Sequence, residues 1–224
     1  MKIIPVKIPN IAKTLLPNFT WNIDTLNKEL YLTFDDGPTP EITDWVLSKL
    51  KMYKAKATFF CIGNNIEKHP DIFQKVIKDG HSVGNHTYNH LKGWKSKTED
   101  YLEDVEKTQL LINSNKAKIV INKLESNPSN LKLFRPPYGK FKPNQSKQIR
   151  ELGYKIVLWE VLPFDWDKSV SEETCLKNIT STAKQGSIIV LHDSVKASRN
   201  LKYVLPRVLE YYSKRGYCFK AITS

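Results

Sequence analysis

Short runs of apolar residues alternate with longer amphipathic stretches along most of this 224-residue chain, and this alternation restricts the possible folds more than any other feature. The apolar runs are continuous rather than interrupted at every second position, which is typical of strands covered on both faces. Strands that alternate with helices pair in parallel, either in a doubly wound sheet or in a barrel. The sequence predicts strands at residues 30–34, 57–62, 81–84, 131–134, 154–159, 187–191 and 217–222.

The predicted helices occupy the intervals between these strands. We expect the first to begin at Thr39, whose side chain would cap it, with Pro40 in the first turn. Residues 113–130, which are rich in Asn, Ser and Lys, fit no element and are predicted to form an insertion. The other helices are predicted at residues 70–78, 98–112, 142–152, 171–184 and 201–214.

The length of the chain suits one domain, which we place at residues 29–224 after an N-terminal extension, residues 1–28. Prolines and lysines interrupt every apolar run of residues 1–21, so neither a signal peptide nor a membrane-spanning segment is predicted there. The three cysteines are an odd number without paired spacing, which favours a reducing compartment. The sequence alone therefore indicates a cytoplasmic protein. Nothing in it indicates an oligomeric state.

The chain is basic, with 35 Lys and Arg against 23 Asp and Glu and a formal net charge of +12. Residues 116–150 contain nine of these cations and one acid, Glu125. Such a segment is either a solvated face or a surface for an anionic partner, such as nucleic acid, a membrane or an acidic glycan. No known nucleic-acid-binding pattern accompanies it, so nucleic acid is not an expected partner.

Residues with metal-binding and acid–base chemistry stand at the ends of several predicted strands. Asp35 and Asp36 end the first strand, and His86 and His90 follow the third with a spacing of four. Alone, an Asp-Asp-Gly sequence is an ordinary turn, and two such histidines are common on solvated surfaces. Together, one carboxylate and two imidazoles match an open catalytic zinc site, and the second aspartate remains to act as a base.

His192 ends the strand predicted at 187–191. Cleavage of an amide requires protonation of the nitrogen that leaves, and an imidazole near its ordinary pKa does this well. His192 is therefore a candidate general acid. The alternative is a histidine packed at a strand end without a chemical role.

Five segments, in this order and spacing, resemble the polysaccharide deacetylase family, the NodB-homology domain of carbohydrate esterase family four. They are TFDDGP (33–38), HTYNH (86–90), RPPYG (135–139), DW (165–166) and LHD (191–193). The resemblance covers about residues 30–222 and implies a distorted (β/α) barrel of about seven parallel strands. It further implies that Asp36, His86 and His90 bind one divalent metal ion, usually Zn²⁺, although such ligands also suit Co²⁺ or another transition metal.

The resemblance also implies roles for residues around the metal. Asp35 would be the general base, oriented by Arg135, and His192 the general acid, supported by Asp165. The backbone N–H of Tyr138 would stabilise the oxyanion. A pocket for the acetyl group would be lined by Pro137, Trp166 and Leu191, for which plain core packing is the alternative.

Two features depart from the family pattern. Many members carry Trp-x-Val-Asp before the Asp-Trp pair, whereas this chain has Leu162 at the position of that aspartate. The basic segment that precedes Arg135 is extended and is expected to alter access of the substrate. Either Asp165 suffices to support His192, or this chain orders the site differently.

The sequence thus predicts a metal-dependent hydrolase that removes N-acetyl groups from glycans containing N-acetylglucosamine, such as chitin oligosaccharides or peptidoglycan. One alternative is hydrolysis of an O-acetyl ester, as on xylan, or of another small amide at the same site. A second is a glycan-binding protein without catalysis, because a fold alone does not establish an activity. Family members usually act in the cell envelope or outside the cell, in contrast to the cytoplasmic location indicated above.

Overall fold

A computed structural model describes residues 5–122 and 131–223 of the protein. Within these residues, seven parallel strands form a sheet in the order β5-β4-β3-β2-β1-β6, and β7 pairs with the start of β1. The strands are β1 (Glu29–Asp35), β2 (Thr58–Cys61), β3 (Ser82–Asn85), β4 (Lys132–Phe134), β5 (Tyr154–Ile156), β6 (Ile188–His192) and β7 (Cys218–Phe219).

The sheet curves until residues 157–161, which follow β5, come to lie against β6. Val161 forms a parallel bridge with Ile189 and donates its N–H to the Ile188 carbonyl at 3.1 Å. The strand predicted at 154–159 therefore ends early, because its partner β4 ends at Phe134 and the chain crosses to β6. This arrangement confirms the predicted α/β fold, a distorted barrel of parallel strands.

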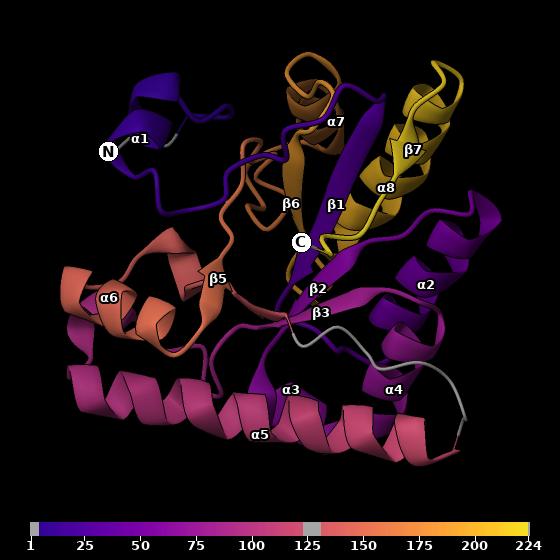
Figure 1. Ribbon diagram of the computed structural model, residues 1–224. Helices are drawn as coiled ribbons and strands as arrows, with labels where there is room; N and C mark the ends of the chain where they lie inside the picture. The colour runs from indigo at the N-terminus through magenta and orange to yellow at the C-terminus, as the bar shows by residue number, and fades with distance from the viewer. Residues whose placement is uncertain (1–4, 123–130, 224) are drawn as a thin grey trace.

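Helices cover the outside of the curved sheet (Figure 1). The long helix α5 lies along one side and contacts α3, α4 and α6. The helices are α1 (Asn10–Leu15), α2 (Ile42–Met52), α3 (Gly63–Lys68), α4 (Pro70–Lys78), α5 (Thr98–Asn122), α6 (Pro143–Glu151), α7 (Glu172–Thr180) and α8 (Ser198–Ser213), with short 3₁₀ turns at Gly93–Lys95 and Pro137–Gly139.

Two predictions about these helices are wrong. The helix expected at 98–112 continues to Asn122, so the first half of the predicted insertion is helical, and residues 123–130 lie outside the described residues. In this part of the helix Asn113, Ser114 and Lys118 are exposed, whereas Asn115 is buried and accepts a hydrogen bond from Gln74. Thr39 does not cap α2, which begins at Ile42, because Glu41 adopts a left-handed backbone (φ 64°) that a helix cannot include.

The core has an outer and an inner layer relative to the sheet. The larger cluster lies between the sheet and the helices and includes Leu32, Phe34, Val46 and Leu205, all fully buried. Residues on the opposite strand face fill the inside of the barrel, because side chains alternate across a strand. They are Tyr31, Phe60, Leu133, Val157, Ile188 and Ile222.

The N-terminal segment packs against the barrel where the sheet is incomplete. Lys7 forms an antiparallel bridge with Val161, and Thr20 a parallel bridge with Val157. The ammonium of Lys13 lies 2.6 Å from the buried carboxylate of Glu160. The boundary that we placed at residue 28 stays a prediction.

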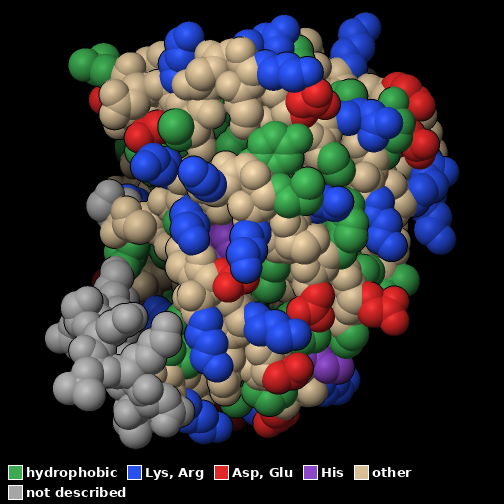
Figure 2. All heavy atoms as spheres, turned by 90° about the vertical axis from the view of Figure 1, so that its right-hand side faces the viewer, with side chains coloured by type: hydrophobic (Ala, Val, Ile, Leu, Met, Phe, Trp, Pro, Cys, Tyr) green, Lys and Arg blue, Asp and Glu red, His purple; other side chains and the backbone are tan. Residues whose placement is uncertain are grey.

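The surface is basic beyond the segment 116–150. Figure 2 shows Lys and Arg side chains spread over the face that lies to the right in Figure 1, with fewer Asp and Glu among them. A scattered distribution of this kind is typical of a solvated face. Among the described residues, no helix has the length and apolar composition needed to cross a membrane.

Candidate active site

Two neighbouring aspartates at the end of β1 face different partners. Asp35 is the last residue of the strand, is buried, and shares its strand face with Thr33. Asp36 follows with a left-handed backbone (φ 79°), and its carboxylate lies beside two histidines instead. The two carboxylates at this strand end therefore have different surroundings and can have different chemical roles.

Arg135, which follows β4, is fully buried and fixes Asp35. Its Nη1 donates to Asp35 Oδ1 and to Thr33 Oγ1, both at 2.7 Å. Nε and Nη2 donate to two backbone carbonyls after β5, at 3.1 and 2.8 Å. A planar guanidinium held at four points restricts the carboxylate to one orientation. The second oxygen of Asp35 faces Nε2 of His86 at 4.0 Å.

Asp36, His86 and His90 form the one group of candidate metal ligands found in the described residues, with their ligand atoms within 4.8 Å of one another. Asp36 Oδ1 lies 3.3 Å from Nε2 of His90 and 3.7 Å from Nε2 of His86. This oxygen is buried and has no hydrogen-bond partner in the described structure. A buried oxygen without a donor requires an explanation, and a bound cation supplies one.

The histidines present the form that binds a metal. His86 Nδ1 lies 2.7 Å from the Arg135 carbonyl, which can only accept, so Nδ1 carries the proton and Nε2 offers its lone pair. Burial lowers the pKa of His86. Burial and the neighbouring His86 lower the pKa of His90 to about 4. Both rings are therefore neutral at neutral pH, as ligation requires.

The loop that carries these histidines is held by two polar residues that the sequence analysis missed. Asp104 on α5 accepts hydrogen bonds from the N–H groups of Tyr88 at 2.6 Å and Asn89 at 2.9 Å. Asn85 accepts from the N–H of Thr87 at 2.9 Å. These bonds fix a loop in which Thr87 and His90 both have positive φ.

His192, at the end of β6, is bound twice by Asp165. Its ring Nδ1 lies 2.9 Å from Asp165 Oδ1, and its backbone N–H donates to Oδ2 at 2.7 Å. Burial lowers the pKa of His192, but the charge and hydrogen bond of Asp165 outweigh it and raise this pKa to about 9. The Trp166 ring lies beside the imidazole, with centroids 4.9 Å apart. Nε2 is left as the ring nitrogen available to a substrate.

Asp193, the next residue, ties this strand end to the aspartate turn. It is fully buried and accepts from the N–H of Gly37 at 3.1 Å and from Thr43 Oγ1 at 2.5 Å. Burial raises its pKa to about 7. The sequence contained Asp193 in the LHD segment without indicating a role for it.

The remaining predicted residues differ in exposure. Tyr138 is 49% exposed, has a left-handed backbone (φ 61°), and its ring lies 4.7 Å from that of His90. Its backbone N–H donates to no group in the described part of the chain. Pro137 is buried beside it, and Leu191 is fully buried in the outer core. The pocket role of Leu191 stays a prediction.

Leu162, the departure from the family pattern, is a core residue here. It is 2% exposed, and its N–H donates to the Val6 carbonyl at 2.8 Å. The backbone of the N-terminal segment therefore lies against this position. Asp165 alone supplies both oxygens that His192 engages.

Comparison with known proteins identifies the class to which this fold and site belong. A family model described as polysaccharide deacetylase matches residues 22–157, and the chain belongs to that family. A peptidoglycan-N-acetylglucosamine deacetylase of Bacillus cereus (strain ATCC 14579) is 34% identical over 206 residues, which cover 91% of each chain.

Two further relatives extend the comparison. Chitin deacetylase 2 of Saccharomyces cerevisiae is 32% identical over 187 residues, 81% of this chain and 55% of that protein. The crystal structure of a peptidoglycan N-acetylglucosamine deacetylase in complex with 4-naphthalen-1-yl-N-oxidanyl-benzamide superposes with a TM-score of 0.83. That match has 30% identity and covers 96% of this chain and 95% of the other. This chain is thus similar to enzymes named for two different acetylated glycans.

Proposed function

We propose that the protein is a metal-dependent N-deacetylase of glycans that contain N-acetylglucosamine, releasing acetate and a free amino sugar. The single observation that carries this proposal is the juxtaposition of two separately held carboxylates at one strand end. Asp36 lies among two neutral imidazoles, while Asp35 is locked by Arg135. Family membership and the relatives named as glycan deacetylases support it.

Asp36, His86 and His90 fit a divalent cation, for which Zn²⁺ is the first candidate. The set combines one carboxylate with two imidazoles, and the buried Asp36 Oδ1 lacks any other partner in the described structure. When bound, the ion would lower the pKa of a water molecule and polarise the acetyl carbonyl. The hydrogen bond from His86 Nδ1 to the Arg135 carbonyl pre-sets the ligand tautomer.

Asp35 acts as the general base in this proposal. Its Oδ1 is occupied by Arg135, so Oδ2 is the oxygen that takes the proton from the attacking water. The backbone N–H of Tyr138 donates to the acetyl oxygen as negative charge develops on it. Its position in a strained, left-handed turn leaves that donor without a protein acceptor in the described structure.

His192 acts as the general acid. Asp165 accepts from Nδ1 and stabilises the imidazolium, so the proton on Nε2 is available to the nitrogen that leaves. An amine is a poor leaving group unless it is protonated, whereas an alcohol leaves more easily. Loss of His192 should therefore affect amide substrates more than O-acetyl esters, which separates the proposed activity from an esterase.

The assignment of the base is tested with Asp35→Asn. The amide keeps the shape and can accept from Arg135, but it cannot take a proton, so turnover should fall by about 10²–10⁴. Metal content, measured by elemental analysis, should equal that of the wild type because Asp36, His86 and His90 are untouched. Acetate release at the wild-type rate by this variant would refute the assignment.

A further inference from the structure

A groove of about 490 Å³ lies next to the candidate active site, between the N-terminal segment and α6. Leu16 and Phe19 line one wall, and Phe141 and Trp94 line another. The groove also contains three cations: Lys140, Lys142 and Arg150. No carboxylate lines it, and no ion pair joins these cations to an acid within the described residues.

Two aromatic rings connect this groove to the metal-ligand candidates. The Tyr138 ring lies 4.7 Å from that of His90 and 5.4 Å from that of Trp94, which belongs to the groove. Both aromatic side chains are exposed, at 49% and 37%. An exposed aromatic ring offers an apolar face against which a sugar ring can pack. A glycan with one acetamide beside His90 would thus extend over Tyr138 and Trp94 into the groove.

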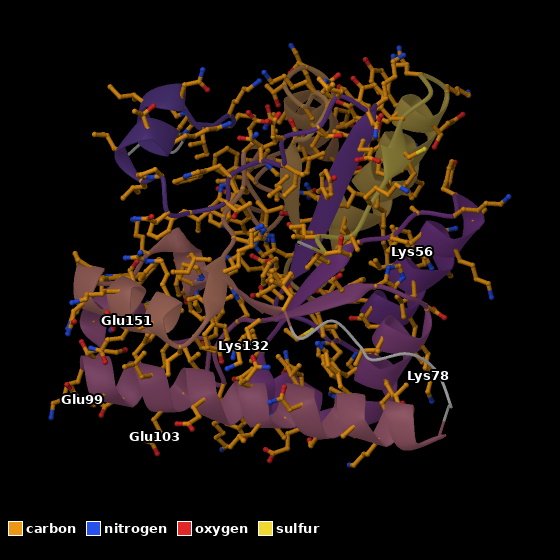
Figure 3. The ribbon with its side chains drawn as sticks, in the orientation of Figure 1. Lys56, Lys78, Glu99, Glu103, Lys132 and Glu151 are labelled. Atoms are coloured by element: carbon orange, nitrogen blue, oxygen red, sulfur yellow. The ribbon has the colours of Figure 1, made fainter. Side chains whose placement is uncertain are left out.

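The basic side chains of the groove lie apart from the acidic side chains of α6 and α5. Figure 3 labels Glu151 on α6 and Glu99 and Glu103 on α5, and the carboxylate of Glu151 lies 3.9 Å from the ammonium of Lys147 on its own helix. Lys140 lies 5.8 Å from the Trp94 ring centroid. Lys142 is half-buried, and its ammonium donates to the Ser96 carbonyl at 2.6 Å. The groove therefore keeps an excess of positive charge that adjacent acids do not neutralise.

We propose that this groove binds the carboxylate of a neighbouring anionic sugar, so that the enzyme prefers the muramic-acid-containing strand of peptidoglycan to neutral chitin. The inference rests on the proposed N-deacetylase function and specifies its substrate. Lys140 and Arg150 contact the lactyl carboxylate of the muramic acid unit, and Trp94 packs against the sugar that precedes it. The basic segment 116–150 thereby contributes to recognition through its last third.

The test compares two tetrasaccharides of equal length, N-acetylchitotetraose and a peptide-free strand in which N-acetylglucosamine alternates with N-acetylmuramic acid. The measured quantity is the ratio of kcat/KM for acetate release from the two. We expect the wild type to favour the anionic strand, and the preference to fall as salt screens the contact. The variant Lys140→Gln/Arg150→Gln should reduce the ratio by about fivefold.

The matched control is Lys147→Gln/Lys202→Gln, which removes the same charge from exposed positions outside the groove. Its ratio should equal that of the wild type. A wild-type ratio of one, or an equal change in both double variants, would overturn the inference and leave the deacetylase proposal standing. Absence of acetate from both substrates would overturn the two together.

Discussion

Replacing Asp165 with asparagine should alter the acid–base chemistry of the site while preserving its shape. Asp165 is 1% exposed and binds His192 through both oxygens, one to the ring and one to the backbone N–H. Asparagine has a single acceptor oxygen, so one of these two donors would face an NH₂ group. The negative charge that stabilises the imidazolium would be lost in either orientation.

The size of the effect follows from the pKa of His192. It is raised to about 9 in the protein, because Asp165 outweighs the lowering by burial. Without that charge it should fall to about 6.5 or below. At pH 8 the protonated fraction would drop from about 90% to about 3% or less, a loss of at least about 30-fold. A cation beside Asp36 would lower both values, so the quantity to test is the difference between the two proteins.

The assay is the pH dependence of kcat/KM for acetate release from a chitin oligomer. Because His192 acts in its protonated form, activity falls as pH rises through its pKa, and Asp165→Asn should move this alkaline limb down by about 2.5 pH units or more. An ester with a good leaving group should lose less activity. The control is Asp167→Asn, since Asp167 bonds to Ser169 and does not touch His192. An unchanged alkaline limb in Asp165→Asn would refute the reasoning.

The metal ligands, the turn at Gly139 and the buried Lys13–Glu160 ion pair can each be tested by substitution. Asp36→Ala should abolish stoichiometric metal binding, seen by elemental analysis, while the circular dichroism spectrum stays that of the wild type. Gly139→Ala should lower kcat. The added Cβ would lie 2.7 Å from the Trp159 ring, at a residue with φ 65°, and would displace the turn that carries the proposed oxyanion donor. A wild-type kcat in this variant would contradict the prediction. Lys13→Met should lower the melting temperature by about 6–12 °C at pH 7. The substitution leaves the buried Glu160 carboxylate without the Lys13 ammonium, at a cost of about 3 kcal/mol in the free energy of unfolding. The double variant with Glu160→Gln should recover most of this loss.

The sequence predicted the strands and the clustering of chemistry at their ends. Continuous apolar runs separated by helices favour parallel pairing of the strands, with helices covering the sheet. The carboxyl ends of parallel strands then meet on one face. Asp36 belongs to one segment and His86 and His90 to another, and this rule brings the two together. The structure places the ligand atoms of the three residues within 4.8 Å of one another. Arg135 meets Asp35 for the same reason.

Other features depend on tertiary contacts that no local sequence pattern predicts. Asp104 lies on a helix face where an acid normally indicates solvent, yet it anchors the loop of His90. Residues 157–161 continue the apolar run of β5 in the sequence, so the sequence pattern predicts a longer strand where the chain in fact crosses to β6. Glu41 takes a left-handed backbone without being glycine, which moves the start of α2. In each case tertiary contacts outweigh local preference.

The most direct test of the account is acetate release by the purified protein from N-acetylglucosamine oligomers, before and after removal of metal by a chelator and after addition of Zn²⁺. We expect release that chelation abolishes and Zn²⁺ restores. Release that persists in protein shown by elemental analysis to be free of metal would contradict it. Failure of metal-loaded protein to release acetate from these oligomers would equally contradict it.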